Sequence, residues 1–519
     1  MNPPFRRANG SSLTGCAAWV LAIVFGFISS SVAAQQNDAS TGSRQPNIFF
    51  EPRISVQHTV TNNARLNDTK ISDQITEVTP GVRWIGNTAR VKGFFDYSLT
   101  GIHYARERGA DHLRHQLNAN GTVEVVDQRL FVDVAGVVAT QPISAFDAPA
   151  GVSPANANES QTSSFRISPY LRGRLGSVAD YQARYSVQDT RTGTDRRSAV
   201  LTQDALLQVD NRRSGQVLGW SVAAQQQALD YSLGRRIDTS TLRGTLFYAI
   251  TPQLTVSGIG GAEATNQLSP VRETSNIWGA GGVWMPSERT SLSFEREKRY
   301  FGNSHNFALE HRTGRTVWRY TDTQGISNGQ GADIASQGTW YDVLDQIYAQ
   351  TIPDPILRDQ QVRRDIAGLG AGANLPVFPN FLRSASTVQR MQQLSLALLG
   401  RRSILTLAVT RSDNRRVDES MPRLGDDFDM NTRIRQHGWN VLLSHRLSPI
   451  TSVNAGLVEQ RSVGTVSGLE TRMRSLTAGW VTLVAPRTSA GLQLRHIVSD
   501  GATNPYSESA IVGTVTHRF

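Results

Sequence analysis

The sequence predicts an all-β protein: a transmembrane, antiparallel up-and-down β-barrel of about 22 strands, with roughly 18 to 22 as the range that its soft segment boundaries allow. Three observations lead to this prediction. Apolar and polar residues alternate with a period of two along most of the chain, short connections alternate with longer ones, and no apolar run after the first residues is long enough for a membrane-spanning helix. One long, partly helical connection interrupts the pattern.

Residues 1–34 are expected to be a cleaved export signal that directs the chain to the outer membrane of a Gram-negative cell. Arg6–Arg7 supply the positive charge, Ala17–Ile28 form the apolar stretch, and Val32–Ala34 offer small residues for cleavage. The apolar stretch is too short to span a bilayer as a helix. Residues 35–52 are expected to form a short periplasmic segment before the first strand.

The composition excludes several classes of function. Cys16 is the only cysteine and lies in the signal, so the mature chain has no disulfide and no cysteine nucleophile. The net charge is +10, and lysine occurs only at positions 70, 92 and 298, so arginine supplies nearly all of the positive charge. Arginine suits acidic sugars or lipopolysaccharide, although ion pairs with Asp and Glu inside a barrel are the simpler interpretation. Basic and acidic residues are interspersed, so we expect no nucleic-acid binding.

Alternation places the barrel in residues 53–519. Between Arg90 and Tyr104 one face carries Val91, Phe95 and Leu99, and the other carries charged or hydroxyl residues. Residues 130–138 and 405–410 repeat the pattern. A wall between lipid and a wet lumen requires one apolar and one polar face.

The connection lengths favour a membrane barrel over a soluble sandwich. Ten short connections are expected at Gly86–Asn87, Asp127–Gln128, Gly176–Ser177, Arg212–Gly215, Thr251–Pro252, Pro286–Ser287, Thr313–Gly314, Gly400–Arg401, Ser448–Pro449 and Ala485–Thr488. A longer, polar connection lies between each successive pair. Ten turns between hairpins imply eleven hairpins, with the short turns on the periplasmic side and the long connections outside.

Residues 325–390 form the one long connection within the barrel. Trp340, Val343, Leu344, Ile347 and Tyr348 have helical spacing, and a Pro-Asp-Pro turn and a glycine-rich stretch follow. Connections of this length are usually folded and functional. The segment either covers the barrel from outside or folds inward as a constriction. The candidate residues for a pore constriction are Trp340, Asp345, Asp354 and Arg358.

The last strand agrees with this architecture. Ile511, Gly513 and Val515 share a face with Phe519, and an aromatic last residue resembles the signal by which the barrel assembly machinery recognises its substrates. His517 occupies a place where an apolar residue is more usual.

No pattern indicates catalysis, a cofactor or a metal. His112 and His115 are the nearest histidine pair, but they lie at the start of a strand in an arginine-rich stretch. His445, His496 and His517 have serines nearby, as a barrel hydrolase would, yet no nucleophile motif is present. We therefore expect that the chain is not an enzyme.

Two glycine-rich stretches and one charged strand have structural interpretations. Residues 258–261 and 279–282 lie within alternating strands without a following helix, so they are not phosphate loops and instead allow bending or close approach of a neighbour. Arg296 and Lys298 share a face with Phe294, which indicates that the lipid-facing stripe ends there and that these cations form a rim facing lipopolysaccharide.

At this point the chain resembles the outer-membrane barrel family associated with exosortase and PEP-CTERM systems and with exopolysaccharide loci. The matching stretches, in order, are Val78–Val82, His115–Ala119, Ile167–Tyr170, Leu344–Asp345, Pro353–Pro355 with Arg358, and Gly400–Arg402 leading into Leu405–Thr406.

The resemblance implies a conduit or accessory for exopolysaccharide export, with exopolysaccharide and periplasmic export components as partners. It brings no catalytic residues. A general porin-like channel and a non-transporting surface scaffold remain the alternatives. Twenty-two strands are also typical of metal-siderophore transporters, but those carry a large amino-terminal plug, which the short segment 35–52 cannot supply.

Overall fold

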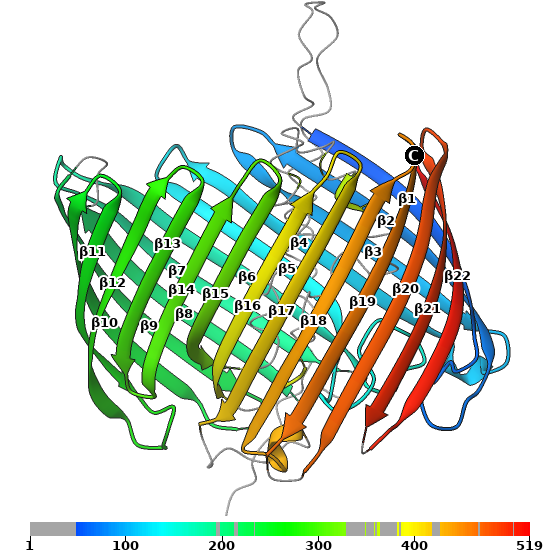
Figure 1. Cartoon of the computed structure of the whole chain (residues 1–519). Coiled ribbons are helices and arrows are strands. Elements are labelled where there is room, and N and C mark those ends of the chain that lie inside the picture. Colours follow the sequence, from blue (N-terminus) through cyan, green and yellow to red (C-terminus); the bar gives the residue numbers. More distant parts are fainter. Residues whose placement is uncertain are drawn as a thin grey trace, which may run out of the picture. The chain divides into compact units, whose positions relative to one another are not determined.

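The computed structural model describes residues 48–193, 198–211, 216–232, 234–328, 348, 358, 361–363, 381–383, 386–417, 426–465, 468–501 and 503–519. These residues form one closed, antiparallel β-barrel of 22 strands (Figure 1), so the predicted fold class is confirmed.

The strands are β1 (Ile48–Thr61), β2 (Asp73–Asn87), β3 (Val91–Tyr104), β4 (His112–Val126), β5 (Leu130–Pro142), β6 (Glu159–Leu175), β7 (Ala179–Thr192), β8 (Ser198–Asn211), β9 (Leu218–Tyr231), β10 (Ile237–Thr251), β11 (Leu254–Thr265), β12 (Glu273–Ser287), β13 (Thr290–Arg299), β14 (Gly302–Arg312), β15 (Thr316–Ser327), β16 (Thr387–Leu399), β17 (Ser403–Arg416), β18 (Arg433–Arg446), β19 (Thr451–Gly464), β20 (Glu470–Ala485), β21 (Thr488–Gly501) and β22 (Tyr506–Arg518). Two single-turn 3-10 helices, η1 (Arg108–Ala110) and η2 (Asp427–Asp429), lie in connections.

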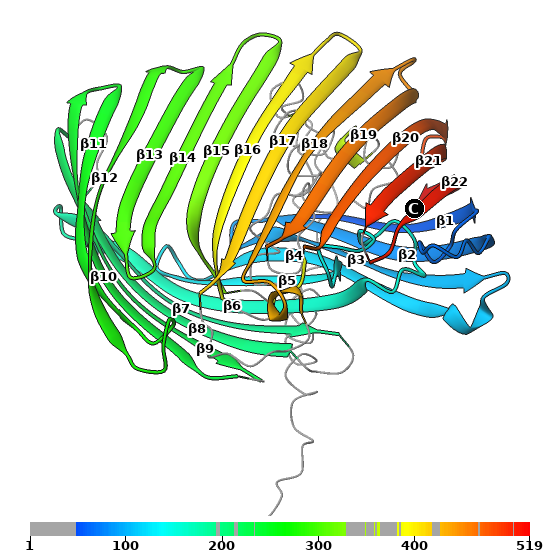
Figure 2. The same cartoon turned by 60° about the horizontal axis from the view of Figure 1, so that its bottom comes forward.

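Each strand pairs with the next, and β22 pairs with β1 to close the barrel. The backbone amide of Phe519 extends this closure by donating to the carbonyl of Pro52 at 3.0 Å. Nine of the ten predicted short connections lie at one end of the barrel, which we call the short-turn end, and the tenth, Arg212–Gly215, lies outside the described residues. The other end, which we call the long-connection end, carries η2 and comes forward in Figure 2.

Alternation gives the wall its two faces. Val56, Leu246 and Leu492 lie on the outer face and are about half exposed, whereas Thr100 and Asn454 lie on the inner face and are buried. A closed sheet satisfies its backbone hydrogen bonds internally, so an apolar outer face can meet lipid. The chain is therefore an outer-membrane β-barrel.

Among the described residues, no helix is both long and apolar enough to cross a bilayer.

Two boundaries differ from the sequence analysis. The first strand begins at Ile48 rather than at residue 53, because residues 48–52 already pair with β2. The ladder with β22 begins at Arg53, so the missing amide of Pro52 interrupts no ladder bond. The long connection runs from 328 to 386 rather than from 325 to 390, because β15 and β16 continue to pair as far as Ser327 and Thr387.

Candidate functional site

The candidate site is the lumen at the long-connection end, where connections from opposite walls meet. β5 and β16 are eleven strands apart in either direction around the closed barrel. Even so, the amide of Leu382, in the connection before β16, donates to the carbonyl of Pro142 at the end of β5 at 3.0 Å. Opposite walls are therefore bridged across the mouth.

The connection 143–158, between β5 and β6, supplies most of this bridge. The carboxylate of Asp427 in η2 accepts from the amide of Ala145 at 2.7 Å and from the hydroxyl of Ser144 at 2.8 Å. The hydroxyl of Thr471 on β20 donates to the carbonyl of Phe146 at 2.7 Å. A segment that leaves β5 is thus fixed to η2, in the connection between β17 and β18, and to β20 on the far side.

Apolar side chains fill the junction. Ala145, Phe146, Phe381, Phe428 and Ile434, which we call the mouth cluster, form a buried hydrophobic core. The rings of Phe381 and Phe428 stack with centroids 6.0 Å apart. Burial of this kind stabilises each large side chain by about 1.5–3 kcal/mol relative to exposure, so the bridge is a packed element.

The two ends of the long connection 328–386 turn toward other walls. The side chain of Gln267 donates to that of Asn328 at 2.6 Å, and the hydroxyl of Tyr231 on β9 donates to the Asn328 carbonyl at 3.0 Å. At the other end, the guanidinium of Arg383 donates to the side chain of Asn414 on β17 at 2.7 Å. The connection therefore begins and ends against the rim instead of extending into solvent.

One described turn of this connection also contacts the lumen wall. Residues 361–363 are helical, and Val362 is fully buried. The Arg363 guanidinium lies 2.9 Å from the carboxylate of Asp96 on β3, and Arg53 on β1 binds the same carboxylate at 2.5 Å. Asp96 lies in the half of β3 nearer the short-turn end. The connection thus reaches well inside the barrel, which selects the inward alternative of the sequence analysis for these residues.

Of the four residues predicted to form a pore constriction, the structure describes only Arg358. Trp340, Asp345 and Asp354 lie outside the described residues. Arg358 is helical and partly buried, on the same connection as Arg363.

Sequence reasoning missed the Arg53–Asp96–Arg363 triad and the bridging role of 143–158. A usable signal was present in the second case. The connection is sixteen residues long, although most of the others at this end are much shorter, and it carries Phe146 within a polar stretch. Asp427 gave no signal, because its partners are distant in sequence.

A network of ion pairs holds the inner wall of β10–β13. Arg243 on β10 lies 2.6 Å from Glu297 on β13, and Arg299 lies 2.6 Å from Glu263 on β11. Arg243 reaches over two intervening strands because their inner face carries glycine. A Cβ at Gly261 would lie 2.2 Å from the Leu242 carbonyl oxygen. Gly261 and Gly279 thus allow the close approach of a neighbouring strand, whereas Gly258 and Gly260 have open space around the position of a Cβ.

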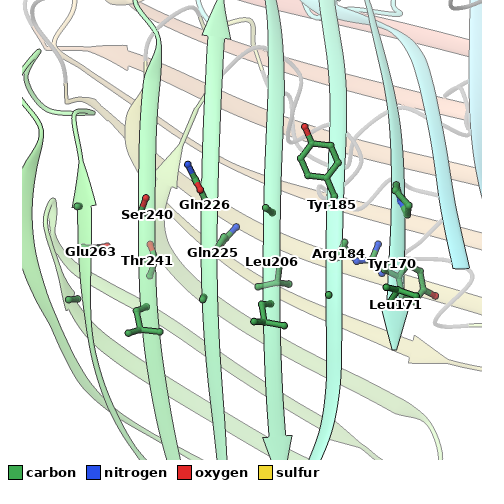
Figure 3. Close-up of a pocket in the computed structure, with 18 of the residues that line it drawn as sticks. Tyr170, Leu171, Arg184, Tyr185, Leu206, Gln225, Gln226, Ser240, Thr241 and Glu263 are labelled. Carbon is green, nitrogen blue, oxygen red and sulfur yellow. The ribbon is translucent and has the colours of Figure 1, made fainter. Parts of the chain in front are cut away.

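The outer wall carries a shallow hollow of about 780 Å³ across β6–β11 (Figure 3). Small outward-facing residues, including Ala205 and Ala224, form its floor, and Tyr185, Leu171 and Leu242 stand around it. Arg184 and Gln225 in the same view belong to the inner face, where Arg184 binds Asp133 at 2.7 Å. The hollow faces lipid and does not open into the lumen.

The histidines near serines or threonines make cross-strand pairs. His445 lies 2.7 Å from Ser403, His496 lies 2.9 Å from Ser509, and His517 lies 2.9 Å from Thr488. Within the described part of the chain, none of these three imidazoles also bonds to a carboxylate, and no group of side chains has the composition of a metal site. The carboxyl-terminal Phe519 is largely exposed, with its ring edge-on to that of His517.

No family model and no curated protein sequence matches this chain. Several solved structures are similar to it along most of their length. The FrpB iron transporter from Neisseria meningitidis, as apoprotein, is 10% identical with a TM-score of 0.48, over 90% of this chain and 81% of that one. The siderophore receptor PirA from Pseudomonas aeruginosa is 10% identical with a TM-score of 0.45, over 92% and 81%. The outer-membrane protein OpdK from the same organism is 8% identical with a TM-score of 0.37, over 91% and 99%.

Proposed function

We propose that the chain is a gated outer-membrane conduit, with a lumen closed at rest by the helical turn 361–363 of the long connection and by the mouth cluster. The observation that carries the proposal is the contact of Arg363 with Asp96 inside the barrel, together with the bridging of β5 to the opposite wall. An open general porin needs a free lumen, whereas a conduit for a polymer needs a wide barrel that is sealed between transport events.

We further propose that the cargo is exopolysaccharide. The inner face of β17–β20 is lined by amide and hydroxyl groups, such as those of Asn440, Asn454 and Thr406, which can exchange hydrogen bonds with sugar hydroxyls. The opposite inner wall carries arginines, including Arg184 and Arg243, whose planar forks suit carboxylates. The family resemblance points to the same cargo.

The first experiment measures planar-bilayer conductance of the intact barrel beside a variant in which residues 329–380 are replaced by a short flexible linker. We expect a small conductance that rises steeply on deletion. Asp96→Asn should also raise the open probability, because it removes the carboxylate that holds Arg363.

Asp133→Asn is the matched control, since Asp133 is also an inner-face carboxylate paired with an arginine, and it has no ion pair with the described residues of the long connection. A large conductance in the intact protein would favour the porin. Silence in all forms would favour the scaffold. Cargo is tested by single-channel block with acidic and neutral polysaccharides of matched length, and block by neither would exclude exopolysaccharide.

A further inference from the structure

The outer face of β17–β20 carries a concentration of positive charge at the long-connection end. Seven arginines and one histidine stand there with only three carboxylates, all on the outward-facing register of these four strands. The residues are Arg411, Asp413, Arg415, Arg433, Arg435, His437, Glu459, Arg461, Glu470, Arg472 and Arg474.

The register brings basic side chains directly opposite one another, including the arginine pairs Arg415–Arg433 and Arg461–Arg472. Arg411 is the cross-strand partner of His437, which is the partner of Arg461, which in turn is the partner of Arg472. Directly opposite residues have Cβ atoms only about 4.5–5.5 Å apart, and like charges in such pairs destabilise a sheet. A row of this kind is favourable only where an anion neutralises it.

The three carboxylates satisfy part of this charge. Glu470 binds Arg461 at 2.6 Å, Glu459 binds Arg472 at 2.9 Å, and Asp413 binds Arg433. In contrast, Arg411, Arg415 and Arg435 are exposed and form no ion pair with a carboxylate among the described residues. Of these, Arg411 and Arg435 lie at diagonal positions on the neighbouring strands β17 and β18.

These cations line a hollow of about 530 Å³, together with His437, Arg461, Val463 and Thr465. The hollow lies directly above the lipid-facing surface. The next outward residues toward the short-turn end include Val409 and Trp439, followed by Leu407, Val441, Leu457 and Leu476. Tryptophan marks the level of lipid headgroups in membrane barrels, so the hollow lies at or just above that level in the outer leaflet.

We propose that this outer-wall site binds the phosphate groups of a phosphorylated glycolipid of the outer leaflet. Arg411 and Arg435 supply the unpaired forks, which match phosphate geometry in a bidentate manner, and His437 and Arg461 flank them. The acyl chains of the same molecule lie against Trp439 and the leucines beneath. Continuity with the apolar surface favours an amphiphile over a free phosphate ion. The proposal is independent of the cargo of the lumen.

The test compares the intact protein with Arg411→Gln/Arg435→Gln in detergent micelles. The probe is a purified bis-phosphorylated lipid A, and the readouts are the number of lipids retained per chain by native mass spectrometry and the dissociation constant by titration. Arg191→Gln/Arg236→Gln is the matched control, because it also removes two exposed cations near the long-connection end, which pair with the carboxylates of Asp189 and Asp230. Resistance to dodecyl sulfate before heating verifies that each variant is folded.

We expect one tightly held lipid on the intact protein and on the control, and affinity reduced by about tenfold or more in the Arg411/Arg435 variant. The dephosphorylated lipid should bind the intact protein as weakly as the phosphorylated lipid binds that variant. Equal retention by all three proteins, or an equal loss in the control, would overturn the site. Displacement by low millimolar inorganic phosphate would show that the site recognises phosphate alone and would overturn the lipid as its ligand.

Discussion

The walls β10–β13 and β17–β20 have the same alternation of inward and outward residues, but most of their carboxylates lie on opposite faces. In β10–β13 the carboxylates of Glu263 and Glu297 lie on the inner face, buried and paired with arginine. In β17–β20 the inner face is lined by amides and hydroxyls, while Glu470 and its arginine neighbours stand exposed outside. A buried ion pair stabilises the wall because neither charge could be hydrated if the pair were broken. Exposed charges stay hydrated, so the outer cluster contributes little to stability and can bind a ligand.

The largest effect is expected on the inner wall. Glu263→Gln leaves Arg299 beside a neutral amide in a place where the glutamate side chain has no exposed surface. Breaking a buried ion pair by removing one partner costs about 3–5 kcal/mol. We expect the free energy of unfolding, from reversible urea titration in detergent, to fall by that amount.

Glu310→Gln provides the comparison. Glu310 is also an inner-face carboxylate paired with an arginine, Arg312, but both side chains are substantially exposed. Its loss should cost less than about 1 kcal/mol. Equal destabilisation by the two variants would show that burial does not distinguish the two pairs.

The second prediction concerns the mouth. Phe428→Ala removes a ring that is buried against Phe381. Emptying such a site costs about 3–5 kcal/mol, and here the loss falls on the bridge rather than on the barrel. We expect faster hydrogen exchange at the Ala145 amide and higher conductance, with the urea midpoint of the barrel unchanged. Phe294→Ala, on the lipid-facing wall, should alter neither exchange at Ala145 nor conductance.

How much of this could be predicted from sequence differs between wall and mouth. The strand number and the nine short turns that the structure describes could be predicted from alternation and turn residues, because every hairpin is a local feature. The strand start at Ile48 was not predicted, and Pro52 is tolerated within β1 because the ladder with β22 begins only at Arg53.

The contacts of the candidate site could not be predicted from the sequence, because they are not local. Asp96 meets Arg363, and Ala145 meets Asp427, across hundreds of residues and opposite walls. No periodicity encodes such a pairing. Likewise, the row of cations on β17–β20 appears only once the register is known, since each strand alone carries an ordinary mixture of charges.

The third prediction is a pH dependence of the mouth. Burial raises the pKa of Asp427, and the neighbouring carboxylates of Asp426 and Asp147 add to this shift. A carboxyl with a raised pKa in the folded state stabilises the structure fully below the ordinary aspartate value, and this contribution is lost as the pH rises through the raised pKa. Protection of the Ala145 amide should therefore fall between moderately acidic and neutral pH. Asp427→Asn should remove that slope, and a slope that persists would assign it to another group.

The smallest effect on stability is expected on the outer face of β17–β20. Glu470→Gln is the same chemical change as Glu263→Gln, but its partner Arg461 remains hydrated, so the urea midpoint should not shift measurably. The freed guanidinium then joins Arg411 and Arg435 beside the outer-wall hollow, and the affinity for phosphorylated lipid A should rise rather than fall. This one substitution thus distinguishes a charge that stabilises the barrel from a charge that belongs to a binding surface. If it destabilised the protein as Glu263→Gln does, the outer cluster would be a structural network and not a binding surface.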